Sequence, residues 1–359
     1  MDIARTFRIA LNTGILALMV AGCGGGGYGS GGGGSGGGSA YKATPLVSDG
    51  TATKYTDPNL VNGWGVAFNP NGFVWVANGG SATSTLYDGN GIPQSLVVAT
   101  PPKPTGIVYN GSADFAVSAA GATGASPFIF ATEEGVIAGW SPTVSRNATI
   151  TAYDGSAANK SYKGLALAAQ GGVNFLYATD FHNGAINVLD RNFAPVAVAG
   201  GFRDAALPAG YAPFGIQTIG TRIYVTYAKQ DATASDAVNG PGLGIVNVFD
   251  TAGKLIKRLA SGGALNAPWG IALAPAGFGS VAGALLVGNF GDGKINAFDA
   301  DSGVMQGTLA KADNTPIVID GLWGIAFGNG LNAQPATTLY YAAGPADETH
   351  GVYGRIDAQ

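Results

Sequence analysis

The chain carries a recurring pattern of short apolar runs, each led by a glycine and separated by turns rich in Gly, Pro, Asn and Asp. One complete copy occupies residues 267–299, with apolar runs at 269–273 and 285–289 and an alternating run that ends in Asp299. Short apolar or alternating runs bounded by turn residues are typical of β-strands. Each copy therefore predicts a group of neighbouring strands.

Six copies follow one another along the chain, and a single glycine marks the same point in each. These glycines are Gly65, Gly106, Gly164, Gly215, Gly270 and Gly324. A period of about 40 to 58 residues that carries only strand patterns indicates a radial array of four-stranded sheets. The sequence thus predicts an all-β fold, a six-bladed β-propeller over residues 41–359.

The second strand of each copy is an apolar run without alternation, as expected for strands that pack on both faces between neighbouring sheets. These runs occupy residues 73–78, 128–132, 176–180, 223–227, 285–289 and 339–343. The sixth copy ends after 352–357 and lacks one strand. We expect the N-terminal run at 41–48 to supply it, so that this strand completes the last blade and leaves no free edge.

Three sequence motifs resemble known propellers: Trp64-Gly65-Val66-Ala67, Val74-Trp75-Val76-Ala77-Asn78 and Tyr177-Ala178-Thr179-Asp180. They are similar to the six-bladed propellers of the NHL-repeat and gluconolactonase-like superfamily. More closely, residues 41–357 resemble a family of uncharacterised exported bacterial proteins with repeated Trp-Gly-Ile-Ala motifs. The resemblance implies a fold and a compartment, and it brings no established activity with it.

The N-terminus predicts export and a lipid anchor. Arg5 and Arg8 precede an apolar run at 9–20, and Val20-Ala21-Gly22-Cys23 resembles a lipobox. We therefore expect a lipoprotein signal peptide at 1–22 and a lipidated Cys23 with a Gly/Ser tether at 23–40. An ordinary secretory signal is the alternative. A membrane-spanning helix has less support, because the run is shorter than the roughly 20 residues that a bilayer requires.

These features predict the location and one partner of the protein. The partner is the lipid bilayer, reached through acylated Cys23. Gly rather than Asp follows Cys23, and by resemblance to lipoprotein sorting signals this favours the outer membrane of a bacterial cell envelope, on its periplasmic or surface face. The net charge is −4 and the 18 Lys and Arg are scattered, so nucleic acid is not expected as a partner.

The loops that join second to third strands, and those that join one blade to the next, share one face in such propellers. Polar residues that converge on a concave opening indicate a binding site; the alternative is that these loops are polar only because they are exposed. The ligand-binding rim is expected to contain Asn62, Asn78, Lys103, Glu133, Lys163, Asp180, His182, Asn289, Asp292 and Asp320. A small molecule, a glycan or an envelope protein would bind there.

A divalent-metal site is a second possibility. The second strands of the first, third and fifth copies end in Asn78, Asp180 and Asn289, and oxygen ligands of this kind suit Ca²⁺ or Mg²⁺. The alternative is that these side chains satisfy backbone groups at the strand ends. The resemblance to gluconolactonase-like enzymes implies an axial metal held by Glu, Asn and Asp, but the matching Glu is not evident here.

Three functions remain open from the sequence. The first is a tethered binding or scaffold module. The second is a metal-dependent hydrolase of the lactonase type, with Asp180 or His182 as the catalytic base. The third is a purely structural envelope module. Trp64, Trp269 and Trp323 recur at one repeat position, which favours packing around the axis over a role in stacking a ligand.

Overall fold

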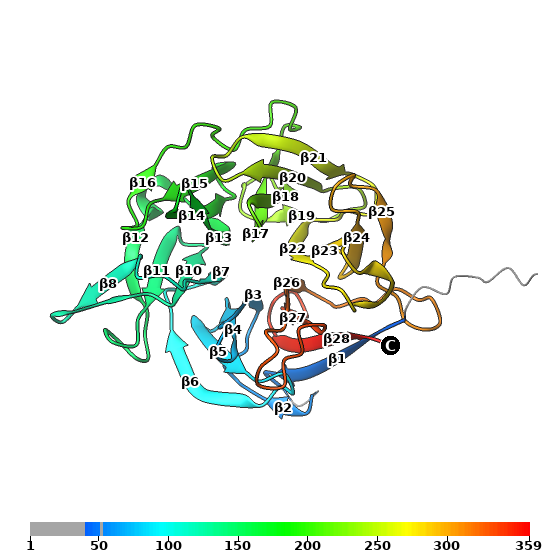
Figure 1. The fold of residues 1–359 in the computed structure, drawn as a ribbon, viewed down its shortest axis with the longest axis horizontal. Coiled ribbons are helices and arrows are strands. Elements are labelled where there is room, and N and C mark those ends of the chain that lie inside the picture. Colours follow the sequence, from blue (N-terminus) through cyan, green and yellow to red (C-terminus); the bar gives the residue numbers. More distant parts are fainter. Residues whose placement is uncertain (1–39, 51–52) are drawn as a thin grey trace, which may run out of the picture. The chain divides into compact units, whose positions relative to one another are not determined.

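The computed structural model describes residues 40–50 and 53–359, and these residues form six antiparallel sheets arranged around an axis (Figure 1). This confirms the six-bladed propeller. The expected signal peptide, Cys23 and the tether as far as residue 39 lie outside the described residues. Within the part that is described, no helix has the length and apolar character needed to cross a bilayer.

Each blade contains four strands, ordered from the axis outward. Blade 1 contains β3 (Gly63–Phe68), β4 (Val74–Asn78), β5 (Thr83–Tyr87) and β6 (Pro93–Ala99). Blade 2 contains β7 (Pro104–Tyr109), β10 (Phe128–Thr132), β11 (Val136–Trp140) and β12 (Ile150–Asp154). Blade 3 contains β13 (Tyr162–Gln170), β14 (Val173–Asp180), β15 (Ala185–Leu189) and β16 (Pro195–Val196).

The second half of the ring repeats this order. Blade 4 contains β17 (Tyr211–Ile219), β18 (Arg222–Gln230), β20 (Ile245–Asp250) and β21 (Leu255–Ser261). Blade 5 contains β22 (Pro268–Leu273), β23 (Leu285–Asn289), β24 (Ile295–Phe298) and β25 (Met305–Thr308). Blade 6 contains β26 (Leu322–Phe327), β27 (Leu339–Ala343), β28 (Val352–Ala358) and the N-terminal β1 (Tyr41–Ser48).

The N-terminal strand closes the ring as expected. β1 pairs antiparallel with β28, with Tyr41 opposite Ala358 and Ser48 opposite Val352. In Figure 1 the blue and red strands accordingly lie side by side in one blade. The innermost strands of neighbouring blades contact one another all the way around, including β26 with β3.

Four short strands were not expected from the sequence. β8 (Ala116–Ala119) and β9 (Ala122–Ala125) form a separate hairpin, whereas β2 (Tyr55–Thr56) and β19 (Ala237–Val238) extend the sheets of blades 6 and 4. The hairpin is inserted between β7 and β10 and projects from the ring in Figure 1. It explains why the step from Gly106 to Gly164 is longer than the others.

The hydrophobic core is divided among the blade interfaces, because each sheet buries both of its faces against its neighbours. Between blades 1 and 2, for example, the rings of Trp75 and Phe128 stack with centroids 4.1 Å apart. A further apolar cluster, the aromatic plug, lies on the axis. It contains Trp64, Phe181, Phe214, Trp269, Phe290 and Trp323.

The repeated glycines are explained by close contact between the innermost strands. A Cβ atom on Gly65 would lie 2.6 Å from the carbonyl oxygen of Thr105, and one on Gly270 would lie 2.6 Å from that of Trp323. A Cβ atom on Gly324 would likewise meet the carbonyl oxygen of Trp64, so the contacts between blades 6 and 1 are of the same kind. Glycine is therefore required at this repeat position, because only glycine lets two backbones approach so closely.

Candidate functional site

A β-bulge at the repeat position before each glycine aims one side chain per blade toward the axis. In blade 5 the register shifts between Pro268 and Gly270, which leaves Trp269 as the extra residue. Bulges commonly redirect a side chain in this way. The six residues at this position are Trp64, Thr105, Lys163, Phe214, Trp269 and Trp323. Four of them belong to the aromatic plug.

The plug is a tightly stacked group. Trp323 lies between Trp64 and Phe290, with ring centroids at 3.5 and 4.0 Å and nearly parallel planes. Trp269 meets both Trp64 and Trp323 edge to face at 5.8 and 5.9 Å. Each of these three tryptophans is at most 9% exposed. This geometry therefore supports the expectation that the three tryptophans pack around the axis.

Lys163 occupies the same repeat position but carries a charge. Its side chain is 3% exposed, and it forms an ion pair with Glu133 and a second, at 3.6 Å, with Asp236. Its ammonium group lies 5.5 Å from the ring centre of Trp64 and 5.8 Å from that of Phe181. A charge at this depth is stabilised both by paired carboxylates and by the faces of aromatic rings.

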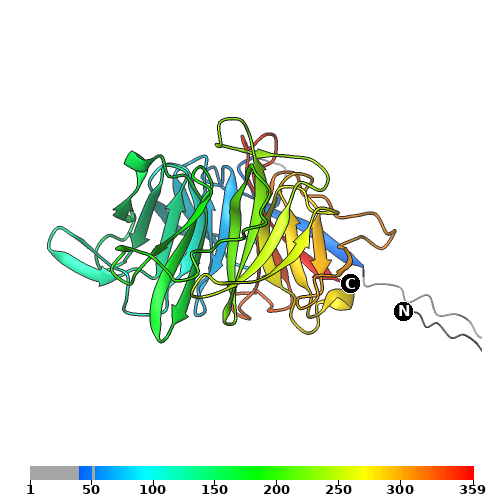
Figure 2. The same ribbon diagram turned by 90° about the horizontal axis from the view of Figure 1, so that it is seen from above.

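Two adjoining hollows, of about 350 and 230 Å³, open above the plug and share Lys103 and Glu133. We refer to them together as the polar cup. Figure 2 shows the loops after β18 and after β27 on the same face of the ring, and these loops supply Asp236 and Glu348 to the cup. The charged and amide residues of the cup are Asn62, Lys103, Glu133, Glu134, Asn159, Lys160, Lys163, His182, Asp236 and Glu348.

Local backbone geometry places two of these side chains. Asn62 and Lys103 directly precede the innermost strands of blades 1 and 2, and both adopt positive φ angles, of 49° and 53°. Left-handed backbone is uncommon for residues other than glycine and is frequent at functional sites. Asn62 also links the cup to the plug, because its amide donates to Glu348 at 2.6 Å and its oxygen accepts from the Trp323 indole at 3.1 Å.

Burial and neighbouring charge change the acidity of Glu348. Burial is the main reason that its pKa is raised, and the negative charge of Glu133 adds to the effect. The hydrogen bond from Asn62 and the charge of Lys163 act in the opposite direction, whereas Asp236 raises the pKa further. The cup thus contains a carboxyl group that retains its proton to higher pH than an exposed glutamate does.

This shift predicts a pH-dependent effect of Glu348→Gln on stability. Since the folded-state pKa exceeds the ordinary value of 4.5, the folded protein binds the proton more tightly, and Glu348 lowers stability as pH rises through that interval. We expect the variant to be more stable than the wild type at about pH 8. Its advantage should shrink as pH falls toward 4.5, as measured by urea unfolding. An advantage that is largest at low pH would contradict the assignment.

The structure brings half of the expected rim residues together. Asn62, Lys103, Glu133, Lys163 and His182 all line the cup. The remaining rim residues have other partners. Asp292 forms an ion pair with Lys294 at 3.1 Å, and Asp320 accepts a hydrogen bond from the Ala346 backbone at 3.0 Å.

The three expected metal ligands are buried within their own blades. Asn78 donates to Thr83 and Thr85, and Asn289 donates to the Ala264 carbonyl and Asp292. The carboxylate of Asp180 accepts hydrogen bonds from the Ser161 and Asn183 backbones and from the Asn183 amide. Among residues 40–50 and 53–359, no group of three or more His, Cys, Asp or Glu side chains is placed to hold a metal ion.

Five charged or amide residues of the cup were not among the ten expected rim residues: Glu134, Asn159, Lys160, Asp236 and Glu348. Glu134 and Glu348 lie in second-to-third-strand loops, so loop position was a usable signal for both. Asp236 lies in the long loop of blade 4, which carries no repeat pattern. Alignment of the six copies was also informative for Lys163, since it shows one lysine where the other blades have Trp, Phe or Thr.

The architecture and site define a six-bladed β-propeller with a polar cup at one mouth. Solved structures with similar folds include a streptogramin B lyase (11% identity, TM-score 0.50, covering 89% of this chain and 97% of that one) and a glucose dehydrogenase (12%, TM-score 0.52, 89% and 100%). At these identities the likeness concerns the fold alone.

The chain belongs to a family that includes two uncharacterised proteins of Acanthamoeba polyphaga mimivirus. It is 34% identical to one, over 80% of this chain and 74% of the relative, and 30% identical to the other, over 89% and 86%. No family model matches the sequence. Because these relatives are viral, the exported bacterial character expected from the sequence stays a prediction.

Proposed function

We propose that the protein is a binding module that holds a small polyhydroxylated molecule, such as a saccharide, in the polar cup. The observation that carries this proposal is Lys163, a charged residue at a repeat position where four of the six blades place an aromatic ring in the plug. Burying a charge costs more than burying an apolar side chain of similar size. A ligand that accepts a hydrogen bond from the ammonium group would account for a charged residue at this position.

The chemistry of the cup fits a ligand whose groups both donate and accept hydrogen bonds. Lys103 and Lys163 supply donors, whereas Glu133 and Glu348 supply acceptors, and Asn62 supplies both. Saccharide hydroxyls combine the two roles at close spacing. The charges of the cup are largely balanced among themselves, as in the 3.4 Å pair between Lys103 and Glu134, so a neutral ligand is favoured over a strongly charged one.

Saturation-transfer NMR and calorimetry with a panel of methyl glycosides and disaccharides test this proposal. We expect at least one member to bind, and Glu133→Gln to weaken that binding about tenfold, since hydrogen bonds to charged groups contribute about 1.5–3 kcal/mol. Asp292→Asn is the matched control, because Asp292 lies in a second-to-third-strand loop outside the cup. Absence of binding across the panel, or equal affinities for wild type and Glu133→Gln, would contradict the proposal.

A metal-dependent hydrolase is the second candidate. One observation favours it: the amide oxygens of Asn78 and Asn289 are buried and have no hydrogen-bond partner among the described residues. The carboxylate of Asp180, by contrast, already accepts hydrogen bonds from Ser161 and Asn183. The three residues therefore fit a metal-ligand set only in part. In this candidate Asp180 or His182 would act as the base.

Metal analysis by mass spectrometry after dialysis, on wild type and Asp180→Ala, separates the two candidates. A retained divalent ion that is lost in the variant supports the hydrolase. No retained ion, together with an unchanged melting temperature in added Ca²⁺, argues against it.

We further propose that acylated Cys23 tethers the propeller to a membrane surface, so that the cup works at the cell envelope. The support is the lipobox-like sequence that ends at Cys23 and the Gly/Ser-rich stretch after it. Metabolic labelling with a palmitate analogue tests this: wild type should incorporate the label and Cys23→Ser should not. Equal labelling of the two would contradict a lipid anchor at Cys23.

A further inference from the structure

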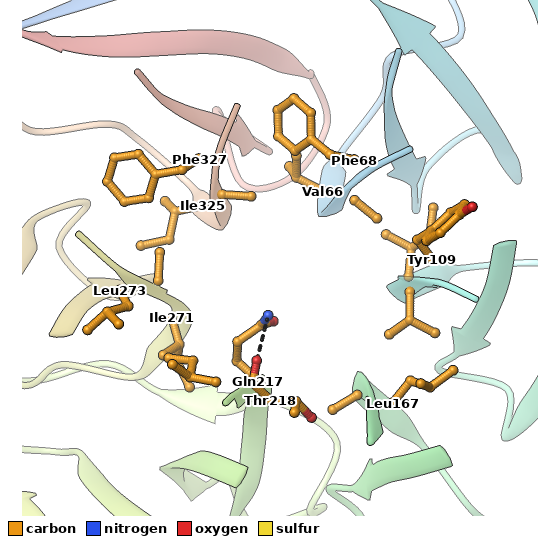
Figure 3. A pocket seen from close by; sticks show the side chains of 17 residues that line it. Val66, Phe68, Tyr109, Leu167, Gln217, Thr218, Ile271, Leu273, Ile325 and Phe327 are labelled. Atoms are coloured by element: carbon orange, nitrogen blue, oxygen red, sulfur yellow. Dashed lines mark hydrogen bonds between the residues drawn. The ribbon is translucent and has the colours of Figure 1, made fainter. Parts of the chain in front are cut away.

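A second cavity opens on the face opposite the polar cup. It has a volume of about 470 Å³ and lies between the carboxyl ends of the six innermost strands, where their side chains surround an open centre (Figure 3). We refer to it as the axial cavity. Toward the cup it narrows to a throat of about 30 Å³ lined by Gly65, Gly106, Gly270 and Gly324, together with Trp269. Because the aromatic plug lies beyond the throat, the axial cavity is blind.

Apart from the Tyr109 hydroxyl, the walls of the axial cavity are apolar in five blades, whereas blade 4 is polar. The third residue after the repeat glycine is Phe68, Tyr109, Leu167, Leu273 and Phe327 in five blades, but it is Thr218 in blade 4. The residue before it is Ala or Val in the same five blades, but in blade 4 it is Gln217. Blade 4 therefore breaks the apolar pattern at two consecutive positions, both of which line the cavity.

Gln217 is exposed within this otherwise apolar lining. Its amide nitrogen donates a long hydrogen bond of 3.4 Å to the Thr218 carbonyl, and Figure 3 shows the side chain reaching toward the centre. A long hydrogen bond of this kind is weak. Most of the hydrogen-bonding capacity of the amide therefore remains for a molecule in the cavity.

The strand edges add further polar groups. In each blade the innermost strand is the edge strand that faces the axis. These six edge strands are β3, β7, β13, β17, β22 and β26. An edge strand presents backbone N–H and C=O groups that the ladder does not use. In the axial cavity these groups alternate with apolar side chains, and none of the described residues that line it is Lys, Arg, Asp, Glu or His.

We propose that the axial cavity binds a small, uncharged, mainly apolar molecule whose single hydrogen-bonding group is held by Gln217. The volume lies within the range of small-molecule pockets, which combine apolar walls with a few placed polar groups. Phe68, Tyr109 and Phe327 provide aromatic faces and edges near the mouth. This site is independent of the polar cup, since the plug separates the two.

Fluorescence titration with 2-naphthol and naphthalene tests this proposal on the full chain. The two probes share a shape, but only 2-naphthol can bond to an amide. Wild type should bind 2-naphthol about threefold or more tightly than naphthalene, and Gln217→Leu should remove most of that preference. Glu133→Gln, a polar-cup variant, should leave both affinities unchanged, so that failure here and failure of the saccharide proposal can be told apart.

Filling the cavity provides the second arm of the test. Ala326→Phe should abolish binding of both probes, and Leu273→Trp at the more exposed rim serves the same purpose if the first variant does not fold. Each variant is checked by its thermal unfolding transition. No saturable binding to wild type, binding that persists in a folded cavity-filling variant, or an unchanged 2-naphthol preference in Gln217→Leu would overturn the proposal.

Discussion

Replacing Gly270 with alanine is expected to destabilise the protein by about 2–4 kcal/mol, or to prevent soluble expression. The added Cβ would lie 2.6 Å from the Trp323 carbonyl oxygen and 3.0 Å from the Ile325 side chain. The nearer atom belongs to the backbone of the next blade, so a side-chain rotation cannot relieve the contact. Blades 5 and 6 would have to separate at the axis, where the plug is most tightly packed.

Gly50→Ala is the matched control, because a Cβ at that position meets nothing within 4 Å. It should change stability by no more than about 0.5 kcal/mol. Denaturant unfolding of the three proteins measures both effects. A Gly270→Ala variant as stable as Gly50→Ala would show that the innermost strands do not approach as closely as described.

Deletion of residues 1–48, which removes β1, is expected to have the second large effect. β1 buries Tyr41, Leu46 and Val47, and the Tyr41 hydroxyl donates to the Phe278 carbonyl at 3.2 Å. Loss of three such side chains costs about 5–8 kcal/mol, which is comparable to the whole stability of a typical domain. The deletion would also expose β28 as an unpaired edge.

Deletion of residues 1–39 is the control for this prediction, since it leaves β1 complete. The shorter deletion should unfold in one cooperative transition, whereas the longer one should aggregate or lose that transition in calorimetry. If both deletions unfold alike, β1 does not contribute to closure.

Much of the fold could be predicted from sequence because every blade must bring its innermost strand close to the next blade and bury its second strand on both faces. The glycine that permits close backbone contact recurs in all six copies, and the doubly buried second strands leave uninterrupted apolar runs. The missing strand of blade 6 predicted ring closure by β1. The β8–β9 hairpin escaped prediction because its Ala-, Ser- and Gly-rich sequence, 116–125, lacks the apolar pattern of a core strand.

The site was less predictable, because loop residues reveal which face they occupy but not which neighbour they meet. Asn78 and Asp180 end equivalent strands, yet the side chains of both form hydrogen bonds within their own blades. Alignment of the six copies sets Lys163 apart, but only the bulge shows that its side chain points to the axis. Gln217 likewise stands out only against the apolar residues that occupy its position in the other five blades.

β1 and β28 share one blade, and this pairing closes the ring around both axial mouths. Ala43 lies opposite Ile356 in the register of β1 and β28, so cysteines at these positions, in a Cys23→Ser background, test it directly. Under mild oxidation, mass spectrometry should find one intramolecular disulfide. The control pair, Ala43→Cys with Thr151→Cys on β12 of blade 2, should remain reduced. Free thiols or only intermolecular bridges in the Ala43/Ile356 pair would contradict the closed six-bladed ring.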